Sequence, residues 1–125
     1  MDAKFHPGEH LKSRKEIGRL FGRGGPGKVS NSYPIRAVYA PMEERRTAYP
    51  AQVTFVVSKR KFKRAVDRNL LKRRMREAYR LHKNQLPPQA DGRQLAVLFI
   101  YTGNEIMESA YIHKKMQKVL RGIKG

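Results

Sequence analysis

The sequence predicts an α/β (α+β) two-layer sandwich, with three helices packed on a small sheet. Apolar residues recur at helical spacing in three segments, and short runs with strand-like patterns lie between them. With 125 residues, of which 39% are hydrophobic, the chain can bury one modest core. Nothing in it resembles a linker between two cores, so we expect a single domain over residues 1–125.

The first expected element is a short helix that begins near Ser13. Ser13 and Glu16 have the spacing of a capping box, and Ile17, Leu20 and Phe21 then fall on one face. The segment that follows contains four glycines and a proline, so we expect the helix to end there.

Three segments have strand patterns. Tyr33–Tyr39 alternates between apolar and other residues, and Gln52–Ser58 contains a short run of valine and phenylalanine. A polar turn, Met42–Thr47, is expected between these two strands. Leu95–Tyr101 is apolar throughout, which predicts a strand buried on both faces.

Two further helices are expected. A long helix over Lys63–Lys83 lies between the second and third of these strands and is ended by Pro87 and Pro88. The last helix covers Ser109–Arg121, where apolar residues form a stripe on one face. The expected order is therefore helix, two strands, helix, strand and helix.

The chain is strongly basic, with a net charge of +18. Self-repulsion of this size disfavours a compact state unless a polyanion neutralises it, so nucleic acid is the leading partner and an anionic membrane surface the second. No apolar run has the length of a membrane span, and the first residues lack the apolar stretch of a signal peptide. The absence of cysteine suits a reducing cytoplasm. Residues 1–9 contain nothing that demands packing, and we expect them to be disordered in isolation.

Half of the excess charge lies in Lys59–Arg80, a net +9 in 22 residues. On a helical projection, four apolar residues share one arc and can face the sheet, while basic and amide side chains occupy an adjacent arc about 100° wide. A helix that buries one face and shows cations on the next is suited to lie along phosphates. The apolar arc comprises Leu71, Met75, Ala78 and Tyr79, and the basic ridge comprises Asn69, Lys72, Arg73, Arg76 and Arg80.

A basic helix face can also be a merely solvated surface. Such faces usually contain glutamates that pair with the cations, whereas only Asp67 and Glu77 are acidic in this segment. We therefore favour contact with RNA or DNA. Arg68 falls within the apolar arc, so either the regular helix begins after it or its guanidinium is directed specifically.

The same segment carries a family signature. It resembles the pattern Ala-Val-x-Arg-Asn-x-x-Lys-Arg-x-x-Arg of the bacterial ribonuclease P protein. Seven fixed positions at fixed spacing are far more specific than a run of lysine and arginine. The first helix, the strand before the motif and the closing helix also fall where this family has them. The matching residues are Ala65, Val66, Arg68, Asn69, Lys72, Arg73 and Arg76.

Three features depart from the family pattern. Lys63 stands where the family usually has a glycine, two residues before the Ala-Val pair. The segment between Ser58 and Ala65 is one residue longer, and Arg74 occupies a position that is often apolar. These departures concern the path of the loop into the helix.

The resemblance implies further details of the fold. The sheet would be mostly antiparallel, and a fourth strand would lie near Lys28–Ser30. The strand–helix–strand unit would have a left-handed crossover, whereas such units are ordinarily right-handed.

The resemblance implies that the chain is the protein subunit of ribonuclease P, an endoribonuclease whose catalyst is an RNA. The complex removes the 5′ leader of precursor tRNA with Mg²⁺ that belongs to the ribonucleoprotein as a whole. The expected partners are ribonuclease P RNA and precursor tRNA, with no membrane and no small-molecule substrate. The residues expected to contact the catalytic RNA are Lys59, Lys61, Arg64, Arg68, Asn69, Lys72, Arg73, Arg76 and Arg80.

In this family the leader strand binds in a cleft between the sheet and the first helix. Unpaired bases stack on aromatic rings there, and cations contact the backbone. For Phe21 and Tyr39, the alternative to leader contact is that they are core residues. The residues expected to contact the leader are Lys12, Phe21, Tyr33, Arg36 and Tyr39.

Intrinsic catalysis is not expected, because no histidine shares a motif with another catalytic group and the acidic residues are scattered. A non-catalytic ribosomal or RNA-chaperone-like protein would account for the charge and size but not for the spaced signature. A DNA-binding module would need an exposed reading helix. A membrane-surface helix would need an exposed apolar face.

Overall fold

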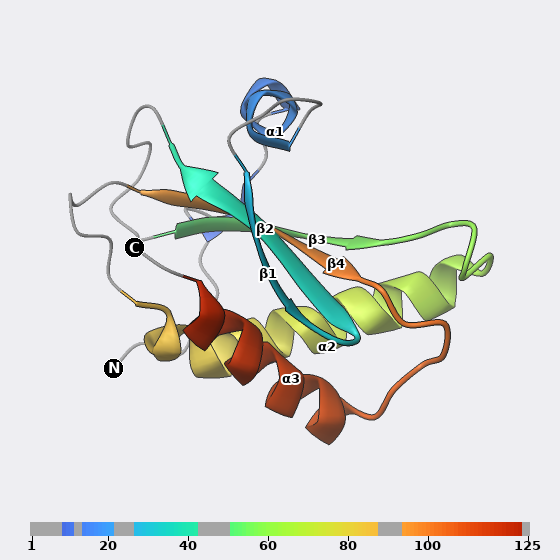
Figure 1. Cartoon of the computed structure of the whole chain (residues 1–125). Coiled ribbons are helices and arrows are strands. Elements are labelled where there is room, and N and C mark those ends of the chain that lie inside the picture. Colours follow the sequence, from blue (N-terminus) through green and yellow to red (C-terminus); the bar gives the residue numbers. More distant parts are fainter. Residues whose placement is uncertain (1–8, 12–13, 22–26, 43–50, 88–93, 124–125) are drawn as a thin grey trace.

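The structure, a computed structural model, describes residues 9–11, 14–21, 27–42, 51–87 and 94–123. Its elements confirm the expected order, including the fourth strand that the resemblance implied (Figure 1). A short 3₁₀ turn, η2, follows the long helix. The elements are α1 Arg14–Phe21, β1 Lys28–Ser32, β2 Ile35–Pro41, β3 Ala51–Val57, α2 Ala65–His82, η2 Lys83–Gln85, β4 Leu95–Tyr101 and α3 Ser109–Gly122.

The four strands form one sheet in the order β1-β2-β4-β3. β1 and β2 form an antiparallel hairpin with Ser32 opposite Ile35, and β2 is also antiparallel to β4. β3 lies at the far edge and runs parallel to β4, with Phe55 opposite Phe99. The sheet is therefore mostly antiparallel, and α2 connects its two parallel strands. The left-handedness of this connection stays a prediction.

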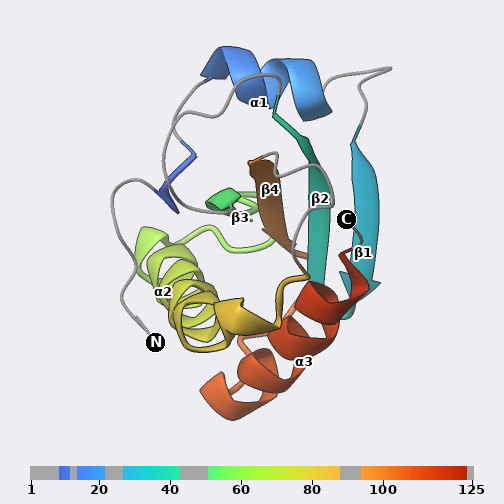
Figure 2. The ribbon, with the colours of Figure 1, turned by 90° about the vertical axis from the view of Figure 1, so that its left-hand side faces the viewer.

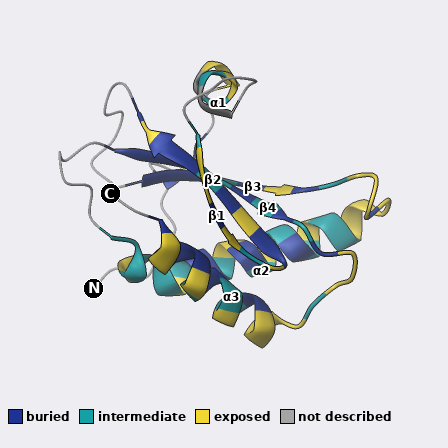
Figure 3. Ribbon diagram, viewed as in Figure 1, coloured by how far each residue is buried: buried dark blue, intermediate teal, exposed yellow. Residues whose placement is uncertain are grey.

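Helices α2 and α3 cover one face of the sheet (Figure 2). Alternate residues of β2, β3 and β4 are buried against them, as the two-residue period of a strand requires. The helices turn their buried sides to the sheet and their exposed sides outward (Figure 3). At the centre, the rings of Phe55 and Phe99 stack with centroids 5.6 Å apart, and Tyr79 packs against both. Removing this apolar surface from water is the main force that holds the two layers together.

The opposite face of the sheet is only partly covered. Helix α1 crosses one end of it, over a second and smaller core (Figure 1). Beyond α1, Leu98 and Ile100 of β4 are only half-buried, so the expected burial of this strand on both faces is wrong for its second half. The small core consists of Leu11, Ala40, Met42 and Ala96, with Ile17 packed against it.

The starts of β2 and α2 differ from the expectation for local reasons. The turn of the β1–β2 hairpin occupies Tyr33 and Pro34, so β2 begins two residues later than expected. α2 begins at Ala65 rather than at Lys63, because Arg64 is still extended, with φ −82° and ψ 128°.

Two expectations concern segments that the structure describes in part. Met42 is buried rather than part of a polar turn, and residues 43–47 lie outside the described residues. Residues 1–8 also lie outside them. Glu9, however, is buried and accepts a hydrogen bond from the Lys83 ammonium at 2.6 Å, so the expected disorder does not extend to Glu9.

Candidate nucleic-acid interface

Helix α2 has the two faces that the sequence predicts. All four residues of the apolar arc are buried. The basic ridge faces solvent, with Asn69, Arg73 and Arg76 exposed and Lys72 and Arg80 half-buried. The packing of one side therefore holds the cations of the other in place.

Most cations of the ridge are not neutralised by the fold. Within the described part of the chain, Lys72, Arg73 and Arg76 have no ion-pair partner. Arg80 pairs with Glu77, with 2.6 Å between Nη2 and Oε2. A partly exposed pair within one helix contributes little to stability, so a phosphate can replace the carboxylate. Cations one turn apart repel each other in the free protein, and a phosphate backbone along α2 would relieve that repulsion.

A shallow hollow lies beside the ridge, lined by Val66, Asp67, Asn69, Leu70 and Arg73. Val66 and Leu70 supply apolar surface, while Asn69 and Arg73 supply an amide and a guanidinium. This combination suits a ribose or an unpaired base next to a bound phosphate.

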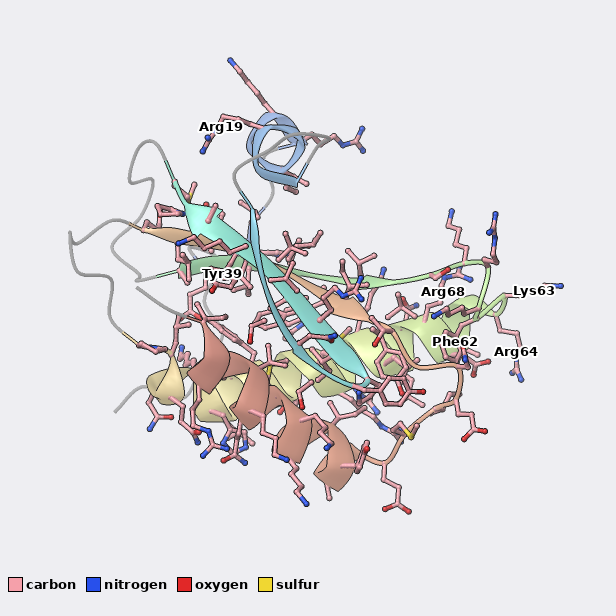
Figure 4. The ribbon with its side chains drawn as sticks, in the orientation of Figure 1. Arg19, Tyr39, Phe62, Lys63, Arg64 and Arg68 are labelled. Atoms are coloured by element: carbon pink, nitrogen blue, oxygen red, sulfur yellow. The ribbon has the colours of Figure 1, made fainter. Side chains whose placement is uncertain are left out.

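Arg68 has a specific partner within the fold, which is the second of the two alternatives. Its Nη1 donates to the carbonyl oxygens of Phe62 and Lys63, each at 2.8 Å. The guanidinium thus turns back along α2 and holds the loop that precedes the helix (Figure 4). Charge-assisted hydrogen bonds are roughly twice as strong as neutral ones. The expected contact of Arg68 with RNA stays a prediction, and it would use the remaining N–H groups.

The loop that joins β3 to α2 is held at further points. Ser58 Oγ accepts hydrogen bonds from the amides of Arg60 and Lys61, at 3.1 and 3.4 Å. Phe62 is 7% exposed and packs edge-on against Tyr101, with ring centroids 5.8 Å apart. The loop therefore has a buried anchor, although its other side chains are charged.

The cations of this loop fall into two groups. Lys61 Nζ donates to the carbonyl oxygen of Thr102 at 2.9 Å, so it is partly occupied within the fold. Lys59, Arg60, Lys63 and Arg64 are exposed, and none of their side chains has a partner among the described residues. Lys63 and Arg64 project outward where α2 begins and extend the basic surface beyond the helix (Figure 4).

A clamp between α2 and the loop after β4 was not expected from the sequence. Arg74 Nη1 donates to the carbonyl oxygen of Met107 at 2.6 Å. The Tyr101 hydroxyl donates to the carbonyl oxygen of Glu105 at 2.6 Å and accepts from the amide of Met107 at 3.2 Å. Burial is the main cause that raises the pKa of Tyr101. The signal in the sequence was Arg74 itself, a cation at a position that is often apolar in the family.

The residues expected to contact a leader strand are separated by the sheet. Arg36 is exposed on the face that α1 crosses, and Tyr33, which is 51% exposed, lies in the hairpin turn. Tyr39 is 5% exposed and belongs to the main core, because three residues along a strand from Arg36 it points to the other face (Figure 4). The leader contact expected for Tyr39 is corrected accordingly. Lys12 lies outside the described residues and only the backbone of Phe21 is described, so both stay predictions.

The face that carries Arg36 also has an aliphatic shelf that was not expected. It consists of Val38, Leu98 and Ile100, which are half-buried, and Val56, which is exposed. The shelf is accessible because α1 covers only one end of the sheet. The strand alternation indicates which residues share this face, but the coverage by α1 depends on the folded chain.

A further pair of titratable groups lies between the two helices in the part of the chain that the structure describes. His82 Nε2 and His113 Nδ1 are 3.1 Å apart between α2 and α3. Burial is the main cause that lowers the pKa of His113, and the nearby His82 lowers it further. Among the described residues, no three His, Cys, Asp or Glu side chains gather where they could hold a metal ion. No described helix combines the length and the apolarity needed to cross a membrane.

Comparison with known proteins identifies the family. The family model described as Ribonuclease P matches residues 5–124. The ribonuclease P protein component of Porphyromonas gingivalis is 40% identical over 119 residues, which cover 94% of this chain and 84% of that protein. That of Chlorobium phaeobacteroides is 46% identical over 104 residues, 76% of this chain and 69% of that protein.

A solved structure shows the same fold. The RNase P protein from Thermotoga maritima superposes with a TM-score of 0.73 at 20% identity, over 94% of this chain and 99% of that one. The family model, the sequence relatives and the fold agree, and the chain therefore belongs to the ribonuclease P protein family.

Proposed function

We propose that this protein docks on the catalytic RNA of ribonuclease P through the basic ridge of α2 and the loop before it, and that its open sheet face holds the 5′ leader of precursor tRNA. Membership of the family makes the chain a protein subunit of ribonuclease P, an endoribonuclease of tRNA processing. RNA is accordingly its partner in that complex. The proposal concerns which surface meets which RNA.

One observation supports docking through α2 most strongly. Lys72, Arg73 and Arg76 lie together on a helix whose other side is packed in the core, and no described carboxylate neutralises them. Guanidinium groups form paired hydrogen bonds with phosphates, and the amide of Asn69 suits a 2′-hydroxyl. Because a packed helix presents these groups, little backbone entropy is lost on binding.

The open sheet face is suited to an unpaired strand. Arg36 supplies a cation for the backbone, and the aliphatic shelf supplies apolar surface for bases. Tyr33 offers a ring on which a base can stack at the end of the hairpin. A single strand presents both phosphates and free bases, whereas a duplex hides its bases.

The bond-breaking chemistry belongs to the RNA in this proposal. Mg²⁺ would be bound by RNA and substrate phosphates, because the described residues supply no cluster of acidic side chains for it. The chain contributes cations that reduce the repulsion between the catalytic RNA and its substrate. Processing of precursor tRNA by this complex would place the protein in the cytoplasm.

Reconstitution tests the proposed function. The protein is mixed with a bacterial ribonuclease P RNA, and cleavage of precursor tRNA is measured at a magnesium concentration too low for the RNA alone. We expect the protein to restore cleavage at the 5′ leader. An absence of stimulation would overturn the assignment.

A double variant and a matched control test the α2 ridge. Lys72→Ala/Arg76→Ala should make the plot of log K against log salt for the catalytic RNA shallower by about 2, because about one counterion is released per phosphate contact. The control Arg14→Ala/Lys15→Ala removes two exposed cations of α1 and should change the slope by less than about 0.5. An equal change in both variants would show that the ridge is not the contact surface.

The leader surface has its own test. Arg36→Ala should weaken binding of precursor tRNA to the assembled complex and leave binding of mature tRNA unchanged, since only the precursor carries the leader. If both tRNAs lost affinity equally, Arg36 would not contact the leader.

A further inference from the structure

The outer side of α3 carries a second basic surface, which the proposed function does not use. The helix buries its apolar side against the sheet and α2. Its other side spans an arc of about 120° that contains four cations and one tyrosine. We define this α3 stripe as Tyr111, Lys114, Lys115, Lys118 and Arg121.

The charges of the α3 stripe are not neutralised. No acidic residue belongs to α3, and none of the four cations has an ion-pair partner in the described part of the chain. Lys115 Nζ lies 5.2 Å from the centroid of the Tyr111 ring, which attracts the ammonium without removing its charge. Lys114 and Lys118 are one turn apart and repel each other. A solvated surface gains nothing from this arrangement, whereas a polyanion would relieve it.

The α3 stripe and the α2 ridge point away from each other. The contacts from His82 to His113 and from Gln85 to Gln117 show that the two helices run side by side in the same direction (Figure 1). The flank of α3 that faces α2 is therefore occupied by neutral side chains, and the stripe lies on the far flank and the outer side. The α2 ridge likewise lies on the flank opposite Arg74, which reaches towards α3. Two separate segments of nucleic acid are needed to cover both surfaces.

We infer that the α3 stripe is a second docking surface for the catalytic RNA, so that two RNA segments hold the helical layer from opposite sides. This inference rests on the proposed function, in which the α2 ridge contacts that RNA. The catalytic RNA is favoured over precursor tRNA because the stripe belongs to the helical layer, whereas the open sheet face lies on the other side of the sheet (Figure 2). From Tyr111 to Arg121 the stripe is roughly 15 Å long, enough to follow several phosphates.

Salt dependence of binding provides the first test. Lys114 and Lys118 are exposed, so Lys114→Ala/Lys118→Ala should fold with an unchanged melting temperature. We expect its slope of log K against log salt for a bacterial ribonuclease P RNA to be shallower by about 2, and the slope change to add to that of Lys72→Ala/Arg76→Ala. The matched control is again Arg14→Ala/Lys15→Ala, which removes the same net charge from α1.

The outcomes separate this inference from the proposed function. A slope change in Lys114→Ala/Lys118→Ala no larger than the control would overturn the second surface, while Lys72→Ala/Arg76→Ala would still report on the first. Loss of binding to precursor tRNA with unchanged binding to the catalytic RNA would overturn the assigned partner. Failure of both double variants to change the slope would contradict docking through the helical layer altogether.

A tethered probe gives a second readout that does not depend on charge. The chain has no cysteine, so Ala110→Cys in α3 and Ala65→Cys in α2 each create one attachment point for an iron chelate without removing a cation. Both residues are exposed. In the complex, radicals from the two positions should cleave two different segments of the catalytic RNA. Cleavage from position 65 alone would overturn the second surface and leave the first intact.

Discussion

Two sets of cations within the same stretch of sequence have opposite roles. Lys61, Arg68 and Arg74 donate hydrogen bonds to main-chain carbonyl oxygens of nearby loops. Lys72 and Arg76, only a few residues away, have no partner among the described residues. The difference follows from direction, because the first set points towards loop carbonyl groups that accept its hydrogen bonds, and the second set points to solvent. In the proposed function, the first set holds the shape of the RNA-binding surface and the second set supplies free cations for the phosphates.

From this division into loop-holding cations and ridge cations, we expect different effects of substitutions. Changes in the loop-holding set should lower stability and disturb RNA binding through the position of the loop. Changes in the ridge should leave stability unchanged and alter only the electrostatics of binding. Four predictions test this difference, from the largest expected effect to the smallest.

Phe62→Ala should have the largest effect. The variant loses a buried ring that packs against Tyr101 and leaves a cavity, so we expect the free energy of unfolding to fall by about 3 kcal/mol. Urea denaturation measures this change. Phe62→Leu keeps most of the volume and should lose less than about 1.5 kcal/mol. Equal stability of Phe62→Ala and the natural chain would show that the ring does not anchor the loop.

Arg68→Ala and Arg73→Ala separate the two roles directly. Arg68→Ala removes the charged donor from two carbonyl oxygens, and we expect a loss of about 1–2 kcal/mol in the free energy of unfolding. Arg73→Ala should stay within about 0.5 kcal/mol of the natural chain. Its salt slope for RNA binding should instead become shallower by about 1. Equal stability of the two variants would remove the distinction between holding the loop and contacting RNA.

Tyr101→Phe should cost about 1 kcal/mol, because two hydrogen bonds to the loop after β4 are lost. The pKa of Tyr101 is raised above its ordinary value of 10.0, so its contribution to stability is full below pH 10 and is lost as the pH rises above it. Urea midpoints at pH 7 and pH 10.5 should therefore differ less in Tyr101→Phe than in the natural chain. An identical pH response in the two proteins would show that ionisation of the Tyr101 hydroxyl does not affect stability.

His113→Gln should have the smallest effect. Burial and His82 lower the pKa of His113 below its ordinary value of 6.5, so the unfolded chain binds more protons than the folded one. Stability is then full above pH 6.5 and falls as the pH drops below it. The urea midpoint should decrease less between pH 7.5 and pH 5.5 in His113→Gln than in the natural chain. An equal decrease in His113→Gln and in the natural chain would contradict the lowered pKa of His113.

Local patterns were sufficient for the three helices, for β2, β3 and β4, and for the division of α2, whereas β1 was expected only from the family resemblance. Leu95–Tyr101 is the β4 strand with the expected bounds, because a short apolar run that contains β-branched and aromatic residues favours a strand. The helical period also places Leu71 and Met75 in the core and Arg73 and Arg76 at the surface. The wrong expectation for Tyr39 had a signal against it, since this residue shares its strand face with Ile35 and Ala37.

Other features depend on contacts between distant segments. Arg68 donates to carbonyl oxygens of the loop before α2. The path of that loop depends on the packing of Phe62 against the ring of Tyr101 in β4. The clamp of Arg74 on Met107 joins residues 33 positions apart. The accessible shelf exists because α1 covers one end of the sheet and leaves the other uncovered. No periodicity within one element contains this information.

The sequence by itself determined the fold class, the two faces of α2 and the family, because these depend on residue type and spacing within single elements. The tertiary structure decided which cations are available to RNA and which hold the protein together. It also decided that the helical layer presents two basic surfaces in opposite directions. The physical reason is that a charged side chain takes its role from the groups within its reach, and those groups come from other parts of the chain.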